Sequence, residues 1–201
     1  MTTPLILAFD TAAAHCAAAV LSGGRIIAST EELMAKGQAE RLLGLVQDLL
    51  SQTGHDISEL NAIGVGIGPG NFTGIRISVS AARGLALGLG IPAVGVSAFD
   101  ALRLGTQGPC LCAVDARRDM VFVQGFEIPA FSTPTLCAVD DLPKGIPMIG
   151  AFGTPPMHPV ADAIAQITAQ RHAQTDAPPA PLYLRAPDAA PARDTPPLIV
   201  P

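Results

Sequence analysis

Apolar and polar residues follow one another in a pattern that predicts alternating strands and helices in the first half of the chain. Short apolar runs bounded by glycine or polar residues are typical of buried strands, whereas apolar residues repeated every three or four positions are typical of helices. On this basis we predict strands at 5–9, 16–21, 25–30, 62–67 and 91–96, and helices at 38–52, 73–89 and 97–104. This order, βββαβαβα, predicts helices packed on a mixed sheet.

The second half predicts a smaller unit and an irregular tail. The predicted strands there are 111–114, 120–126 and 147–150, and a helix follows that uses Val160, Ile164 and Ile167. Beyond it, 8 of the last 26 residues are proline, which prevents regular elements. We therefore expect an N-terminal lobe at 1–105, a smaller C-terminal lobe at 106–175 and a Pro-rich tail at 176–201.

The composition indicates a chain that buries a sizeable core and carries little charge. Of its 201 residues, 49% are hydrophobic and only 14% are charged, below the usual quarter. Two explanations stay open: apolar surface that a partner covers, or an Ala- and Gly-rich composition that inflates the hydrophobic share. The net charge of −5 disfavours strong direct binding to nucleic acid, because the phosphate backbone requires a basic surface.

The spacing of cysteine and histidine predicts no metal centre. Cys110 and Cys112 lie on one face of a predicted strand, and no CxxC or Cys/His zinc pattern occurs, so we expect buried, reduced thiols. The histidines offer no pair four residues apart and no HExxH motif; they are His15, His55, His158 and His172. The uncharged apolar stretch 84–99, with 16 residues, is too short to span a bilayer. Without a recognisable leader, we expect the cytoplasm and no membrane association.

A glycine-rich turn separates a predicted strand from a predicted helix. It comprises Gly68, Pro69, Gly70, Asn71, Phe72, Thr73 and Gly74, and Arg76 lies one turn into the helix. Backbone N–H groups at such a helix start can bind an anion. However, the lysine of a Walker A loop is missing, and both GxGxxG frames fail, at Asn71 and at Thr73. A tight strand-to-helix connection is therefore favoured over a phosphate site.

A longer string around this turn, together with further segments in the same order, matches one known family. The segments are 61–78, 82–87 and 91–97, supported by 6–11, 39–43, 115–118 and 181–185. They include Gly68-Pro-Gly-Asn-Phe-Thr-Gly-Ile-Arg76, Ile6-Leu-Ala-Phe-Asp-Thr11 and Pro181-Leu-Tyr-Leu-Arg185. These strings resemble the B-type subunit of bacterial tRNA threonylcarbamoyladenosine biosynthesis. The chain departs from that family at Asn71, where serine is usual, at Gln38, where histidine is frequent, and in its short second lobe.

The resemblance implies a fold, partners and a reaction. The implied fold is α/β: an actin-like ATPase (ribonuclease H-like) fold of two lobes with mixed sheets, the second reduced and the nucleotide site degenerate. The implied partners are the catalytic paralogue, which is the D-type subunit, and a small P-loop ATPase, which is the E-type subunit, with tRNA met indirectly through the complex. That complex transfers threonylcarbamoyl to the adenosine next to the anticodon of ANN-decoding tRNAs. No cofactor is expected for this chain.

The residues themselves favour a non-catalytic role. The catalytic paralogue carries a His-x-x-x-His pair, which has no counterpart here. Actin-like phosphate loops carry glycine close after an aspartate, but alanine or arginine follows both Asp10-Thr11 and Asp115. These three residues form a candidate vestigial nucleotide site, in which the carboxylates are expected to cap local turns; water-mediated Mg²⁺ binding at Asp10 is the weaker alternative. The alternative function is an active actin-like ATPase or small-molecule kinase.

The first two long predicted helices are the candidate partner interface. Their apolar residues are Leu42, Leu45, Leu49, Ile75, Val79, Ala82, Leu85 and Ala86. We expect four-helix docking with the paralogue and a homodimer when the chain is alone, with loss of pairing but not of folding in Val79→Glu. The alternative is that these faces are internal, and both can hold for so apolar a helix. Arg117 and Arg118 are candidate tRNA or partner contacts, and the tail around Tyr183 is expected to fold back onto the body or a partner.

Overall fold

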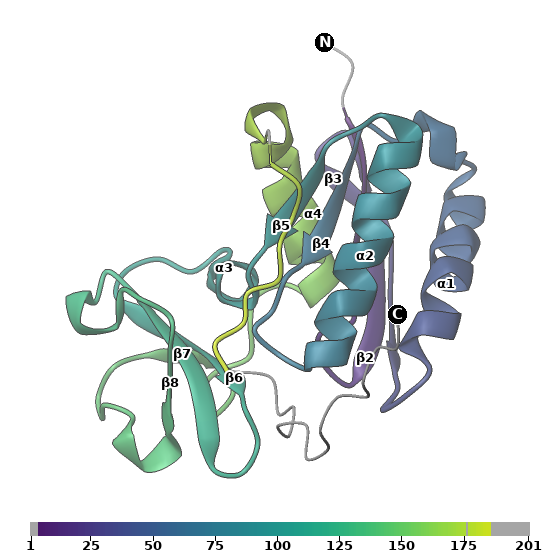
Figure 1. The fold of residues 1–201 in the computed structure, drawn as a ribbon. Helices are drawn as coiled ribbons and strands as arrows, with labels where there is room; N and C mark the ends of the chain where they lie inside the picture. The colour runs from purple at the N-terminus through teal and green to yellow at the C-terminus, as the bar shows by residue number, and fades with distance from the viewer. Residues whose placement is uncertain (1–3, 176, 186–201) are drawn as a thin grey trace, which may run out of the picture.

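The computed structural model describes residues 4–175 and 177–185, which form two sheets with helices around the first (Figure 1). The first sheet has the strand order β3-β2-β1-β4-β5. Its strands are β1 (Leu5–Asp10), β2 (His15–Ser22), β3 (Arg25–Leu33), β4 (Ala62–Gly66) and β5 (Ala93–Val96). The pairs β1–β2 and β2–β3 are antiparallel, whereas β1–β4 and β4–β5 are parallel. This is the mixed sheet that the pattern predicts.

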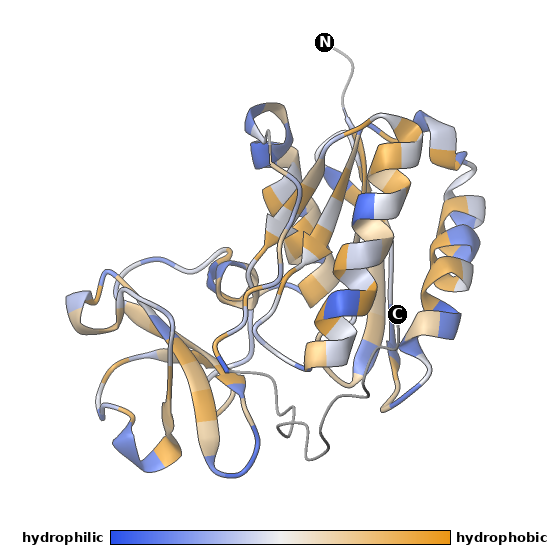
Figure 2. Cartoon of the chain, in the orientation of Figure 1, coloured by the Kyte–Doolittle hydropathy of each residue, from blue (hydrophilic) through white to orange (hydrophobic). Residues whose placement is uncertain are grey.

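Helices cover both faces of this sheet, which explains why β1 is a continuous apolar run rather than an alternating one. Leu7 and Phe9 point into the core beneath α1 (Gln38–Thr53) and α2 (Phe72–Leu89). Ile6 and Ala8 point into the opposite core, beneath α4 (Val160–Arg171). Figure 2 shows that the strands of this sheet are largely hydrophobic, whereas hydrophobic and hydrophilic residues alternate along the helices beside it. The sheet is therefore the central layer of a three-layer lobe.

The second sheet repeats the strand order of the first. After α3 (Ala98–Arg103), β6 (Cys110–Asp115) pairs antiparallel with β7 (Met120–Phe126), which pairs with β8 (Thr135–Ala138). On the other side β6 pairs parallel with β9 (Met148–Gly150), giving the order β8-β7-β6-β9. These four strands reproduce β3-β2-β1-β4. The prediction of an actin-like (ribonuclease H-like) fold with a reduced second lobe is thus confirmed.

Short 3₁₀ helices and one long helix complete the fold. The 3₁₀ helices are Ile57–Glu59, Pro129–Phe131, Val139–Asp141 and His172–Gln174. Helix α4 lies in the range predicted for the second lobe, 106–175, but its Ile164 and Ile167 pack beneath the first sheet. The division at residue 105 stays a prediction. Within the described ranges, no helix combines the length and hydropathy needed to cross a membrane.

The segment 177–185 runs back along the body and touches both lobes, as Figure 1 shows in yellow. The Leu182 N–H donates to the Ile67 carbonyl oxygen at 2.8 Å, just beyond β4. The side chains of Leu182 and Leu184 pack against the core of the second lobe. The expectation that this part of the tail folds back is therefore met, whereas 186–201 lies outside the described residues.

Candidate functional site

The glycine-rich turn lies against the turn between β1 and β2. A Cβ atom on Gly70 would collide with the Ala12 carbonyl oxygen, and one on Gly74 with the Thr11 carbonyl oxygen. Gly68 has φ of 89°, a left-handed conformation that favours glycine. The glycines thus serve close backbone packing, because two turns separated by about sixty residues meet without room for side chains.

Polar groups at the start of α2 are consumed within the chain. The Asn71 N–H donates to the Ala12 carbonyl oxygen at 2.7 Å, and the Gly74 N–H donates to the Asn71 side-chain oxygen at 3.0 Å. In addition, the Thr11 hydroxyl donates to the Gly74 carbonyl oxygen at 2.6 Å. A helix start binds an anion through free N–H groups. Here the Asn71 N–H and the Thr11 hydroxyl join the two turns, and the Gly74 N–H is used within its own turn, which is the geometry of a tight connection.

Asp10 is buried and already paired. Its side chain accepts a hydrogen bond from the Ala12 N–H at 3.0 Å and lies 2.6 Å from His15 Nε2. Glu31 on β3 lies 3.5 Å from the other imidazole nitrogen. Burial opposes the charged imidazole, but the hydrogen bond and charge of Asp10, aided by Glu31, raise the pKa of His15. The Asp10 carboxylate therefore already has the His15 imidazole as its partner across the turn between β1 and β2.

Asp115 occupies the equivalent place in the second lobe but is exposed. Its carboxylate accepts a hydrogen bond from the Arg117 N–H at 2.8 Å, so it caps its own turn as Asp10 does. Arg117, Arg118 and Asp119 then adopt φ of 61°, 54° and 57°. Three consecutive residues in the left-handed region are costly for L-amino acids. The turn displays both arginine side chains on the surface.

The thiols are buried, as their strand positions predict. Cys16, Cys110 and Cys112 are buried, and Cys137 is half-buried. Burial raises the pKa of the Cys16 thiol to about 11 and that of the Cys112 thiol to about 12. Because the nucleophile is the thiolate, neither group is poised to react at neutral pH.

The residues predicted for the partner interface line the core of the chain itself. Leu42, Leu45, Leu49, Ile75, Val79, Ala82 and Ala86 are buried between the helices and the first sheet, and Leu85 is half-buried. This corrects the expectation for Val79→Glu: at 3% exposure the new carboxylate would lie in the core and destabilise the fold. On the same two helices Leu43 is 57% exposed and Leu87 is 85% exposed. A helical period alone marks the apolar face without saying what covers it.

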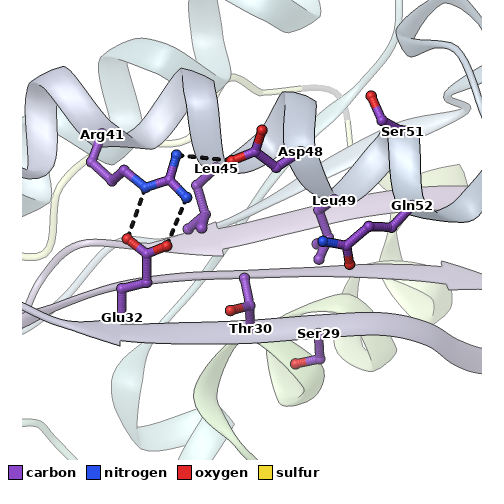
Figure 3. Close-up of a pocket in the computed structure, with 9 residues that line it drawn as sticks. All are labelled: Ser29, Thr30, Glu32, Arg41, Leu45, Asp48, Leu49, Ser51 and Gln52. Atoms are coloured by element: carbon purple, nitrogen blue, oxygen red, sulfur yellow. Dashed lines mark hydrogen bonds and ion pairs between the residues drawn. The ribbon is translucent and has the colours of Figure 1, made fainter.

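An ion-pair network fills the depression between α1 and β3 (Figure 3). Arg41 donates to both carboxylate oxygens of Glu32, at 2.7 and 2.8 Å, and to Asp48 at 3.0 Å. The hydrogen bonds from Arg41 lower the pKa of Glu32. Because the guanidinium already faces two carboxylates, this depression ties α1 to the edge strand rather than offering a free binding group.

A second depression, of about 450 Å³, lies between α2 and the tail segment. It is lined by Arg76, Val79, Ser80, Arg83, Pro181 and Tyr183. The rings of Phe72 and Tyr183 stack with centroids 4.7 Å apart, and Arg76 Nε donates to the Tyr183 hydroxyl at 2.9 Å. The last residue of the predicted turn motif, Arg76, is thereby joined to Tyr183, the centre of the tail motif.

Comparison with known proteins places the chain. Residues 25–133, more than half of the 201-residue chain, match the family described as TsaD, tRNA N6-adenosine threonylcarbamoyltransferase. This chain belongs to the TsaD family. The match spans the signature turn, both long helices of the first lobe and the Asp115 turn.

Several relatives of the chain are named TsaB. The tRNA threonylcarbamoyladenosine biosynthesis protein TsaB of Escherichia coli is 40% identical over 122 residues, covering 58% of this chain and 52% of that protein. An uncharacterized Mycobacterium tuberculosis protein is 33% identical, covering 92% of this chain and 94% of that one. The solved structure of YeaZ from Pseudomonas aeruginosa superposes with a TM-score of 0.72 at 27% identity, covering 92% and 100%. The chain thus spans about half of the Escherichia coli relative, and the predicted resemblance to the B-type subunit is confirmed.

Proposed function

We propose that this chain is a non-catalytic scaffold subunit needed for threonylcarbamoyl transfer to the adenosine next to the anticodon of ANN-decoding tRNAs. Membership of the TsaD family and the TsaB names of its relatives support this reaction. One observation carries the non-catalytic role. The groups that could hold a nucleotide at the first turn are engaged internally: Asp10 with His15, and the Asn71 N–H with Ala12.

The scaffold acts through the outer faces of α1 and α2. Their inner faces are buried in the core, so a partner meets Leu43 on α1 and Leu87 on α2. Gly84 and Gly88 are exposed on α2, and a Cβ on either would meet only open space. Exposed leucines beside glycines suit close packing against another helix pair. The partner in this proposal is the catalytic paralogue, with the P-loop ATPase joining the complex in the cytoplasm and a homodimer forming when the chain is alone.

Reconstitution tests the function. Purified catalytic paralogue and P-loop ATPase, supplied with threonylcarbamoyl-adenylate and an ANN-decoding tRNA, should transfer the group only when this chain is added. Increasing concentrations of this chain should raise the rate to saturation at a stoichiometric ratio with the paralogue. Full transfer without it would refute the scaffold role.

A pair of leucine variants tests the proposed face. Leu87→Glu on α2 should weaken the complex with the paralogue about tenfold, since an exposed apolar anchor is replaced by a charge. Leu33→Glu on β3 is the matched control, because the two leucines are 85% and 83% exposed. Neither change should lower the thermal midpoint. Equal affinities for both variants and the wild type would place the interface elsewhere.

Nucleotide binding separates this proposal from the alternative, an actin-like ATPase or small-molecule kinase. Titration of the pure chain with ATP and Mg²⁺ should give no heat of binding at micromolar concentration and no phosphate release. Micromolar affinity with turnover would replace the scaffold with an enzyme.

A further inference from the structure

The depression between α2 and the tail carries two arginines, Arg76 and Arg83, for which the described part of the chain provides no carboxylate partner. Arg76 and Arg83 are seven residues apart on α2, two turns of one face. Within 4–175 and 177–185, Arg41, Arg103 and Arg171 each form an ion pair, whereas neither arginine of this groove does. In a chain with a net charge of −5, two guanidinium groups on one helix face without a carboxylate among the described residues are a local excess of positive charge.

Arg76 is held ready for a ligand. Its guanidinium lies 4.0 Å from the centroid of the Phe72 ring, and its Nε is occupied by the Tyr183 hydroxyl. The two terminal nitrogens are left to donate, and a fixed planar fork matches a carboxylate in bidentate geometry. Stacking on the Phe72 ring leaves the terminal nitrogens of Arg76 free to donate hydrogen bonds. Because the stacked side chain is already ordered, less conformational entropy is lost when it binds a ligand.

The tail segment 177–185 forms the other wall of the groove and is anchored to both lobes. Leu182 donates its N–H to the Ile67 carbonyl oxygen in the first lobe, at 2.8 Å. Leu182 and Leu184 pack in the second lobe, where Arg185 also donates to the Ala116 carbonyl oxygen at 3.4 Å. Alternation along this extended segment then turns the intervening Tyr183 toward α2. A wall fixed at both ends keeps the groove open in one shape.

We infer that this groove binds the carboxylate side chains of an acidic segment on the partner subunit, with Tyr183 as the contribution of the tail to the interface. The inference rests on the proposed function and extends its surface from α1 and α2 to the tail. The occupant is a protein rather than RNA, because the groove is walled by Pro181 and the Tyr183 ring and has only two arginines. Tracking a phosphate backbone requires a longer basic surface.

Charge reversal at the open end of the groove tests this inference with the full-length chain and the purified catalytic paralogue as the probe. Arg83→Glu should weaken the complex about tenfold, and its affinity should depend less on salt than that of the wild type, because a charged contact is lost. Arg25→Glu on β3 is the matched control: also an exposed arginine, outside the groove, with an expected change below about twofold. Tyr183→Ala should weaken binding several-fold, and Tyr183→Phe less, because it keeps the ring.

The outcomes separate the two proposals. If the wild type forms no complex with the paralogue, the proposed function fails and the groove assignment fails with it. If the wild type binds and Arg83→Glu binds equally well with the same salt dependence, only the groove assignment is refuted. If Arg83→Glu instead lowers affinity for an isolated tRNA transcript and leaves the paralogue complex intact, the groove serves nucleic acid and the inference is wrong.

Discussion

The two lobes share a strand order and a local device but use it differently. In each, the first strand ends in an aspartate whose carboxylate accepts a hydrogen bond from the N–H two residues later. The distances are 3.0 Å at Asp10 and 2.8 Å at Asp115. Such a bond closes an Asx turn and requires no ligand. The shared topology therefore explains both aspartates without a nucleotide.

The surroundings of the two turns differ. In the first turn, Asp10, Thr11 and Ala12 are buried against the glycines of the α2 turn, and Asp10 is paired with His15. The Asp115 turn is exposed and continues through residues in the left-handed region. The Asp10 turn packs against α2, whereas the Asp115 turn lies on the surface of the protein. An actin-like phosphate site needs open backbone at both turns, and in the first turn the carbonyl groups of Thr11 and Ala12 are covered by the α2 turn.

The largest effect is expected where the first turn meets α2. Gly74→Ala should lower the free energy of unfolding by about 3 kcal/mol, because the added methyl group overlaps the backbone carbonyl of Thr11, which cannot move without opening the turn. Urea denaturation followed by circular dichroism measures the change.

The matched control lies in the same helix. Gly84 is exposed and a Cβ there meets nothing within 4 Å, so Gly84→Ala should raise stability by about 1 kcal/mol through helix propensity alone. Equal effects of the two alanines would mean that the contact between the turns contributes nothing to the fold.

The next largest effect separates the two aspartates. Asp10→Asn should lower the free energy of unfolding by about 2 kcal/mol, because a buried charge-assisted hydrogen bond to His15 is lost. Asp115→Asn should stay within about 0.5 kcal/mol, since the side chain is exposed. Chemical denaturation of the two variants side by side checks the contrast, and similar losses would show that the second turn contributes to packing as much as the first.

Much of the fold could be predicted from local pattern, because strand and helix periods are properties of neighbouring residues. The strand β3 extends to Leu33, beyond the predicted end at residue 30, since the polar Glu31 and Glu32 conceal it. The short β8 (Thr135–Ala138), half exposed, carries no clear apolar period and was not predicted. The local hydrophobic pattern therefore predicts strands and helices that have a buried face, and it misses strands that have none.

The candidate site was less predictable, because it depends on contacts between distant residues. The pairing of Asp10 with His15 forms across the turn between β1 and β2, and the stacking of Phe72 on Tyr183 joins residues on α2 and the tail. The apolar face of α2 was identified, but the sequence pattern could not distinguish a partner from the sheet that covers Val79. The sequence motifs include Arg76 and Tyr183, but they do not indicate that these two side chains form a hydrogen bond.

Between pH 6 and pH 8.5, stability should depend on pH through His15 in the first turn. The pKa of His15 in the folded chain is raised above its ordinary value of 6.5, despite burial, by Asp10 and Glu31. A raised folded-state pKa stabilises the fold fully below about 6.5, and this contribution is lost as pH rises through the folded-state value. The urea midpoint should therefore fall from pH 6 toward pH 8.5. In His15→Gln that slope should flatten; an unchanged slope would assign the pH dependence to another group.

The smallest effect concerns the second turn and runs in the opposite direction. Arg118 has φ of 54°, so Arg118→Gly relieves a left-handed residue and should raise stability by up to about 1 kcal/mol, less the entropy that glycine adds to the unfolded chain. In the first lobe, the hairpin between β2 and β3 uses Gly24 at φ of 74°, and Gly24→Ala should cost a similar amount.

A measurement of tRNA binding tests why Arg118 occupies a left-handed position that favours glycine. If the Asp115 turn displays Arg117 and Arg118 for tRNA or a partner, Arg118→Gly should weaken tRNA binding by the assembled complex, most clearly at low salt. Stability and binding would then move in opposite directions at one residue, which is the signature of a surface held for function. A more stable variant with unchanged binding would instead leave the left-handed arginine without a functional reason and make the second turn as purely structural as the first.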